Sequence, residues 1–210
     1  MHWVVAMRCA RQFSKTLSVK MLVTVGRSMA LLHRHGREWS PPKGWARDRL
    51  DVTWLHGAPN PIASLPLQYQ RVVGEAHDRL GPILTALCAQ TSHVLHADLH
   101  QGNYRFDPGC DVGVIDFDDC AVGHPAQDIA IAFYYLKKYS NQDELQCAFR
   151  KGCEELEPWP LDSPTLEALL VWRALSLCAS VLTHENSKIR GQAAGYLGEW
   201  AARCERWLAA

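Results

Sequence analysis

The chain has 210 residues, of which 48% are hydrophobic and 21% charged, an ordinary balance for a globular protein. Lysine plus arginine and aspartate plus glutamate both number 22, so the formal net charge is zero. This balance provides no basic field for a phosphate backbone, and we expect no nucleic-acid partner. No continuous apolar run reaches the roughly 18 residues that a membrane span needs, and we expect no membrane association.

The eight cysteines are scattered, and none forms a C-x-x-C pair. The chain is also long for a disulfide scaffold, so we expect reduced thiols and a cytoplasmic location. The apolar start at residues 2–7 is followed at once by Arg8 and Arg11, whereas a signal peptide carries its charge first.

Two helices are predicted in the first part of the chain. Apolar residues recur at three- and four-residue steps from Leu22 to Leu32, which predicts a helix over residues 15–35 that ends at Gly36. A second helix is predicted over residues 64–90, where Gly81-Pro82 marks a break or a kink.

The middle of the chain changes to short strands separated by polar loops. Three strands are predicted, with a turn at residues 107–109 after the second: 92–95, 104–106 and 112–115. Four further helices are predicted: 126–138, 143–154, 163–184 and 190–208. The sequence therefore predicts an α+β fold that is mainly helical, with a small central β-hairpin element.

Polar side chains gather at the ends of these strands. His96, Asp98 and Asn103 lie in the loop after the first strand, and Asp116 ends the third. A hairpin between the second and third strands would bring Asp116 beside Asn103. Phosphoryl transfer to a hydroxyl needs a carboxylate that accepts the proton and hard oxygen ligands that hold Mg²⁺. The pattern therefore predicts one base and two magnesium ligands at the mouth of the hairpin.

The string His96-x-Asp98-x-x-x-x-Asn103 resembles the H-x-D-x-x-x-x-N motif of the aminoglycoside phosphotransferase family, which includes choline and homoserine kinases. Residues 114–119 resemble the metal-binding I-D-F-D segment of that family, and residues 123–130 resemble its G-x-x-x-x-D-[IL]-A helix start. Residues 31–36 are similar to its L-H helix end, and the loop at residues 39–51 is similar to the bacterial stress-response kinase branch.

The resemblance implies the C-lobe of a protein-kinase-like fold, with ATP as co-substrate and Mg²⁺ as cofactor. The implied acceptor is a small-molecule alcohol or a protein Ser/Thr. By position, the resemblance implies that Asp98 is the catalytic base and that His96 orients the loop. It implies that Asn103 and Asp116 are the magnesium ligands and that Asp128 is the buried acid at a helix start. Three neighbours are candidates for substrate or outer contacts, with their roles left open: His100, Asp118 and Asp119.

The resemblance assigns residues 21–210 to the C-lobe and leaves residues 1–20 as an atypical segment in place of an N-lobe. Lys20 lies too close to His33 to be the phosphate-binding strand lysine of an N-lobe. We therefore expect little kinase activity from the chain alone. A separate N-lobe partner, or a homodimer formed through the apolar residues 3–7, would cover the exposed surface.

Other readings of the same residues remain open. His96 and Asp98, with His124 or His184, could form a 2-His-1-carboxylate iron site, and His96, Asp98 and His100 could bind a hydrolytic zinc. A non-catalytic helical scaffold that binds a partner is a third reading.

Two charged features outside the loop also need an interpretation. Arg173 lies on an apolar helix stripe, which predicts a structural ion pair. The acidic stretch of Glu154, Glu155 and Glu157 is either a solvated helix end or an attractor for a cationic acceptor.

Overall fold

The computed structural model describes residues 17–53, 60–106 and 111–210. The predicted turn at residues 107–109 and the apolar residues 3–7 lie outside these ranges, as does most of the N-terminal segment 1–20.

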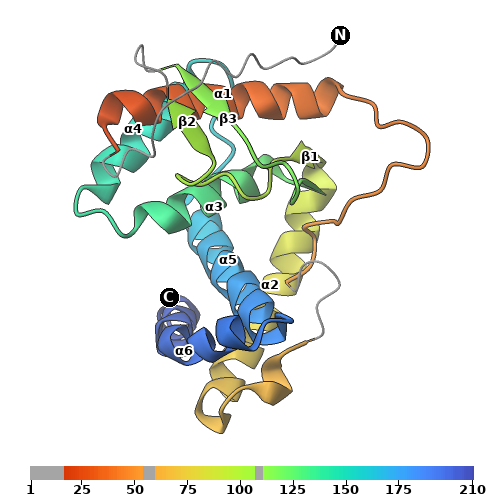
Figure 1. The fold of residues 1–210 in the computed structure, drawn as a ribbon, viewed down its shortest axis with the longest axis vertical. Helices are drawn as coiled ribbons and strands as arrows, with labels where there is room; N and C mark the ends of the chain where they lie inside the picture. The colour runs from red at the N-terminus through yellow and green to blue at the C-terminus, as the bar shows by residue number, and fades with distance from the viewer. Residues whose placement is uncertain (1–16, 54–59, 107–110) are drawn as a thin grey trace.

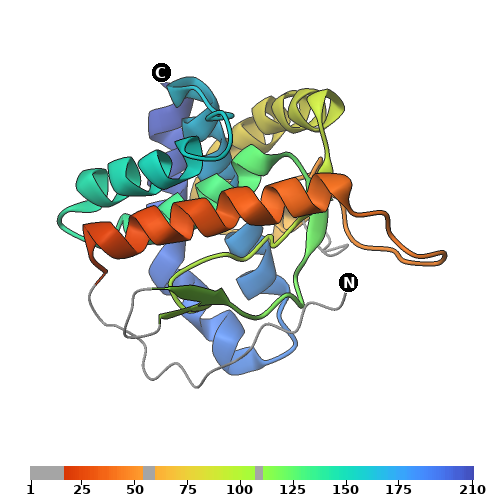
Figure 2. The same cartoon turned by 90° about the horizontal axis from the view of Figure 1, so that it is seen from above.

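The fold is mainly helical, as predicted. The helices are α1 (Val19–Glu38), α2 (Leu67–Gln90), α3 (Pro125–Leu136), α4 (Gln142–Glu154), α5 (Ser163–Thr183) and α6 (Ser187–Leu208), with a 3₁₀ turn at Ile62–Ser64. Side chains that accept a backbone N–H cap four helix starts: Ser18, His124, Asp162 and Asn186. Helices α1 and α4 lie side by side along one face (Figure 2), and α5 runs from α3 towards α6 (Figure 1).

The strands form two short antiparallel pairs. They are β1 (His93–Leu95), β2 (Tyr104–Phe106), β3 (Val112–Val114) and β4 (Ala121–Gly123). Pairing of β2 with β3 confirms the predicted hairpin, with Tyr104 opposite Val114. The prediction missed β4, which pairs with β1 and also bonds through Val122 to the backbone of Asp48 and Leu50. Three residues that include a glycine are too short to show a strand pattern.

Gly36 does not end the first helix, because α1 continues to Glu38. A Cβ atom at Gly36 would lie 2.2 Å from the carbonyl oxygen of Val94 in β1. The glycine therefore allows close approach between α1 and β1 and is not a stop signal. Gly26 plays a similar part where α1 crosses α4, since a Cβ atom there would lie 2.0 Å from the Phe149 carbonyl oxygen.

Of the predicted break or kink at Gly81-Pro82, the break is wrong, because α2 runs through both residues. Pro82 lies on the exposed face of α2, where water can hydrogen-bond the carbonyl that proline leaves without a partner. The helix therefore loses one hydrogen bond there without a buried polar group.

Helix α5 is both long and apolar. By length and composition it is the one helix among the described residues that could cross a membrane, a property that the sequence analysis expected of no segment. Within the fold, 61% of its apolar window is buried, including Trp172. Contacts with α2, α3 and α6 account for this composition, because they make α5 a core helix.

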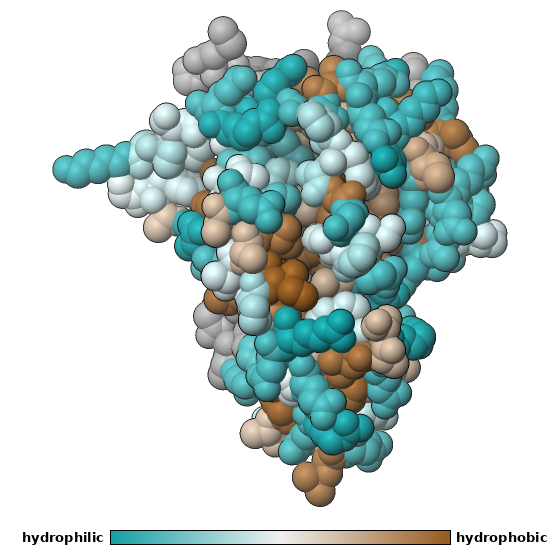
Figure 3. Space-filling model, turned by 180° about the vertical axis from the view of Figure 1, so that it is seen from behind, coloured by the Kyte–Doolittle hydropathy of each residue, from teal (hydrophilic) through white to brown (hydrophobic). Residues whose placement is uncertain are grey.

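Among the described residues, few large apolar side chains are exposed. The exposed ones are dispersed over several elements: Val19, Leu31, Val52, Leu67, Phe117, Leu156 and Tyr196. The rear face of the protein is mostly hydrophilic, and apolar residues gather on it in a narrow band near the middle (Figure 3).

Candidate active site

The reactive loop, residues 96–103, connects β1 to β2 and is hydrogen-bonded to the first turn of α3. The Asp128 carboxylate, in the first turn of α3, is fully buried and accepts hydrogen bonds from the backbone N–H groups of His96 (3.1 Å) and Ala97 (2.7 Å). Ala97 has φ 63°, a left-handed conformation that is rare for residues other than glycine. The two bonds to Asp128 stabilise the sharp turn that places the following residue, Asp98, at the surface.

Helix α1 contributes to the same anchor through His33. Its Nε2 atom lies 3.1 Å from Oδ2 of Asp128. Burial acts to raise the pKa of Asp128, but the contacts with His33 and with the loop outweigh burial and hold that pKa below its ordinary value. Asp128 therefore remains an ionised acceptor for the loop.

Asp98 lies at the edge of the core with 20% of its side chain exposed. Its Oδ1 atom is 2.7 Å from Nη2 of Arg173, and its Oδ2 atom is 3.3 Å from Nε2 of His100. Partial burial acts to raise the pKa of Asp98, but the His100 contact and the Arg173 charge prevail and lower it. The carboxylate is thus ionised, oriented and accessible.

Asn103 connects the Asp98 loop to the turn that carries Asp116. Its Nδ2 group donates to the carbonyl oxygen of Asp98 (2.8 Å) and to Oδ2 of the same residue (3.3 Å). The backbone carbonyl oxygen of Asn103 accepts the N–H of Ile115 (3.1 Å), the residue directly before Asp116. The β2–β3 hairpin therefore brings Asp98, Asn103 and Asp116 to one mouth, where Asp116 is exposed and has φ 67°.

His96 is held by two backbone groups. Its Nε2 atom lies 3.0 Å from the carbonyl oxygen of Ile115, to which it must donate, and its Nδ1 atom accepts the N–H of Asp98 at 3.3 Å. The ring also packs on Phe117, with 4.6 Å between centroids. Nε2 therefore joins the loop to the turn after β3, and Nδ1 holds the backbone of the loop itself.

The histidines of the iron reading have other tasks in this fold. His124 caps α3 by accepting the N–H of Ala126, and His184 accepts the N–H of Asn186 before α6. No group of three His, Cys, Asp or Glu side chains within the described ranges is placed to hold a metal, which also applies to the set of His96, Asp98 and His100.

His100 faces Asp98 and covers a tyrosine that the sequence analysis did not identify. Its Nδ1 atom accepts the N–H of Gly102 (2.9 Å), so its Nε2–H points to Asp98, and its ring lies 4.6 Å from that of Tyr135. Tyr135 follows two other aromatic residues in α3, and nothing in that run distinguishes it in the sequence. Asp118 and Asp119 are exposed in the turn after Asp116.

Arg173 forms an ion pair, and its partner is the candidate base. It projects from α5 with only 7% of its surface exposed, and its Nη2 atom also lies 3.0 Å from the hydroxyl of Tyr135. An isolated arginine in an apolar helix was the available signal, but the sequence could not identify a partner 75 positions away.

The acidic stretch after α4 is neutralised by α1. Glu155 pairs with Arg27, and Glu157 pairs with Arg37 at 2.7 Å. These contacts favour the solvated helix end over an attractor for cations. Lys20 is an exposed residue in the first turn of α1, not in a strand.

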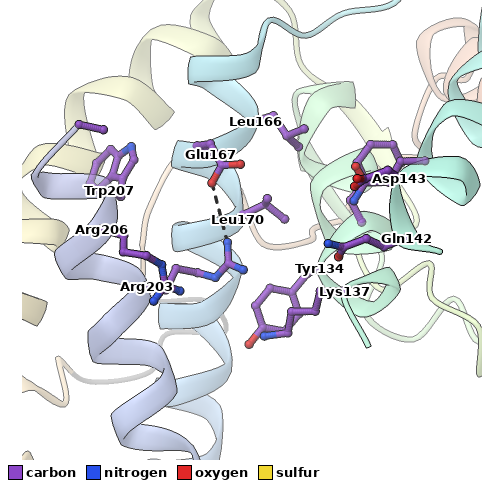
Figure 4. A pocket seen from close by; sticks show the side chains of 13 residues that line it. Tyr134, Lys137, Gln142, Asp143, Leu166, Glu167, Leu170, Arg203, Arg206 and Trp207 are labelled. Carbon is purple, nitrogen blue, oxygen red and sulfur yellow. Dashed lines mark ion pairs between the residues drawn. The ribbon is translucent and has the colours of Figure 1, made fainter. Parts of the chain in front are cut away.

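A cavity of about 390 Å³ lies away from this site, between α3, α4, α5 and α6. Figure 4 shows its charged lining, in which Arg203 faces Glu167 at 4.0 Å. None of Asp98, Asn103 and Asp116 lines this cavity, so it does not belong to the hairpin mouth.

Solved structures with this fold are kinases by their descriptions. They include a microcompartment-associated aminopropanol kinase (24% identity, TM-score 0.64, 92% of this chain and 63% of that one). A second is the amicoumacin kinase hAmiN bound to AMP-PNP and Ca²⁺ (19%, TM-score 0.69, 89% and 60%). A third is a choline/ethanolamine kinase family protein from Mesorhizobium loti (20%, TM-score 0.59, 90% and 65%).

In each case the chain spans less than two thirds of the length of its relative, and the shared part is the kinase-like C-lobe. A search of curated proteins gave no match. Residues 5–156 match the sequence profile of the phosphotransferase enzyme family. On this match, which covers more than half of its length, the chain belongs to that family.

Proposed function

We propose that this chain carries the reaction centre of an ATP- and Mg²⁺-dependent phosphotransferase whose acceptor is the hydroxyl of a small-molecule alcohol. The observation that supports the proposal is the convergence of Asp98, Asn103 and Asp116 at the hairpin mouth. One base and two oxygen ligands gathered at one hairpin mouth meet the needs of phosphoryl transfer.

In this proposal Asp98 accepts and orients the acceptor hydroxyl. Its ionised state and partial exposure suit that role, because a base must be unprotonated and within reach of its substrate. His96 keeps the loop in register with the turn after β3 through its bonds to Asp98 and Ile115.

Asn103 and Asp116 would hold the magnesium ion. Asn103 uses Nδ2 for Asp98, which leaves its Oδ1 atom for a cation, and Asp116 adds an exposed carboxylate. Two hard oxygen ligands fit Mg²⁺, which usually takes few ligands from the protein. The ion would neutralise the charge of the nucleotide phosphates.

The names of the relatives support the proposed acceptor class. An aminopropanol kinase and a choline/ethanolamine kinase family protein are named for amino alcohols, and hAmiN was solved with an ATP analogue. If no small-molecule alcohol in a panel is phosphorylated, a protein Ser/Thr acceptor becomes the alternative.

Transfer from [γ-³²P]ATP to choline, ethanolamine or 1-amino-2-propanol tests the reaction. We expect slow turnover by the chain alone, reduced roughly 100-fold or more in Asp98→Asn, because general bases contribute about 10²–10⁴. The exposed Asp143→Asn is the matched control and should retain the wild-type rate. Equal rates in Asp98→Asn and wild type would contradict the assignment of the base.

A binding measurement tests the metal site without turnover. Mn²⁺ replaces Mg²⁺ in oxygen sites and broadens nearby NMR signals, so we expect broadening centred on Asn103 and the turn at Asp116. Asp116→Asn should weaken it, whereas Asp143→Asn should not. Absence of both metal binding and turnover would favour the non-catalytic scaffold.

A further inference from the structure

Arg173 is a charged residue flanked by apolar residues in helix α5. It lies near the middle of α5, where the residues on either side are Trp172 and Ala174, both fully buried. Burial of a guanidinium is costly unless the charge has a close partner. The placement therefore calls for a specific compensating interaction.

The Asp98 carboxylate is that partner. Nη2 of Arg173 lies 2.7 Å from Oδ1 of Asp98 and 3.0 Å from the Tyr135 hydroxyl, and the guanidinium carbon is 5.5 Å from the Tyr135 ring. Nε of Arg173 is buried and has no hydrogen-bond partner among the described residues. Arg173 thus leaves its Nε donor unpaired among the described residues while its Nη2 group contacts Asp98.

The two oxygens of Asp98 are held from opposite sides. Oδ1 faces Arg173 from α5, and Oδ2 faces Nδ2 of Asn103 and Nε2 of His100 from the reactive loop. A carboxylate offers about four lone pairs, so these three donors leave one free, on Oδ1 beside Arg173. An acceptor hydroxyl that bonds to Asp98 would use this position.

We infer that Arg173 is a positioning residue that fixes the rotation of the Asp98 carboxylate, so that the free lone pair of Oδ1 is presented at the hairpin mouth. The inference rests on the proposed function to the extent that Asp98 is the base. Arg173 acts through Asp98 and is not itself assigned to the acceptor or the nucleotide.

A purely stabilising role predicts a different result from substitution. Loss of one member of a buried ion pair is destabilising when the other charge is left without compensation. Asp98 keeps 20% of its side chain exposed and its contacts with Asn103 and His100, so Arg173→Met should leave this carboxylate compensated and need not unfold α5. It would leave Asp98 restrained by the loop alone. Reaction geometry should therefore suffer even where the fold does not.

The experiment compares Arg173→Met and Arg173→Lys with Arg203→Met as the matched control. Arg203 also projects from a C-terminal helix and pairs with a carboxylate, that of Glu167, but it lies in the separate cavity of Figure 4. The direct reporter is the side-chain amide signal of Asn103 in ¹⁵N–¹H spectra, because this group donates to Asp98.

We expect Arg173→Met to shift the Asn103 side-chain signal, Arg173→Lys to shift it less, and Arg203→Met to leave it in place. In [γ-³²P]ATP transfer to 1-amino-2-propanol, Arg173→Met should lower kcat by about 100-fold, the penalty for a misplaced reacting group, with KM for ATP within about twofold. Arg173→Lys should recover part of kcat.

An unmoved Asn103 signal in Arg173→Met, or an equal shift in Arg203→Met, would overturn the inference. If Arg173→Met fails to fold, Arg173→Lys decides: an unchanged Asn103 signal and unchanged kcat overturn the inference, and an intermediate change supports it. The spectra do not require turnover. A shifted signal in a chain that neither transfers phosphate nor binds Mn²⁺ would therefore refute the proposed function and retain the positioning contact.

Discussion

Asparagine in place of Asp128 would test how α3 holds the reactive loop. The change is nearly isosteric, but it removes the charge and turns one acceptor oxygen into an NH₂ donor. The carboxylate now accepts from the backbone N–H groups of His96 and Ala97 and contacts Nε2 of His33. In the variant at least one of the two loop N–H groups would face a donor instead of an acceptor.

The expected loss is several kilocalories per mole. A hydrogen bond to a charged group contributes about 1.5–3 kcal/mol, so the two bonds from the loop together contribute about 3–6 kcal/mol. These two bonds share one carboxylate, so we take about 3–5 kcal/mol as the loss in unfolding free energy. The left-handed Ala97, φ 63°, would relax wherever the NH₂ group of asparagine replaces the oxygen that accepts its N–H.

Urea unfolding followed by circular dichroism gives the free energy, and amide hydrogen exchange reports on the loop. We expect the His96 and Ala97 amides to lose protection in Asp128→Asn beyond the global change. Asp119→Asn, at an exposed position, is the control and should change stability by less than about 0.5 kcal/mol. A loss under about 1 kcal/mol with both amides still protected would refute the anchoring role of Asp128.

Two further predictions concern the fold around the site. Gly26→Ala should destabilise the protein by about 1–3 kcal/mol or more in urea unfolding, because its Cβ would lie 2.0 Å from the Phe149 carbonyl oxygen. Gly74→Ala, with open space around the position in α2, should instead stabilise it by about 0.5–1 kcal/mol, and equal effects would contradict the crossing argument. Burial lowers the pKa of His93 from 6.5 to about 4, with smaller effects from His33 and Arg37, so the folded state keeps this ring neutral. The unfolded chain takes up the proton first on acidification; stability should therefore be complete above pH 6.5 and fall between 6.5 and 4, by up to roughly 1.4 kcal/mol per pH unit, and His93→Leu should remove this slope.

The local parts of the site could be predicted from sequence. The β2–β3 hairpin places Asp116 beside Asn103 because strand alternation and a polar turn are local signals. The resemblance also selected Asp98 and Asp128 from among many acidic residues. Helix positions followed from apolar periodicity, with ends displaced by a few residues.

The long-range parts could not be predicted. Gly36 carried a stop signal by residue type, but its reason is a carbonyl of β1 that lies 58 positions later in the chain, at Val94. Pro82 carried a breaker signal, which an exposed helix face tolerates. The partner of Arg173 depends on how α5 packs against α3. Each of these outcomes depends on tertiary contacts or solvent exposure, which a single sequence does not specify directly.

The contacts that shape the site come from elements outside the reactive loop. Asp128 in α3 holds the loop backbone, Arg173 in α5 holds the Asp98 carboxylate, and Ile115 after β3 holds the His96 ring. His33 links Asp128 to α1, the helix whose separation from α4 is set by Gly26. A substitution that pushes α1 away from its neighbours would therefore act on the reactive loop through His33 and Asp128, although it touches no candidate site residue. Loss of loop order in Gly26→Ala, detected as faster exchange of the Ala97 amide than global unfolding allows, would distinguish this coupling from simple destabilisation.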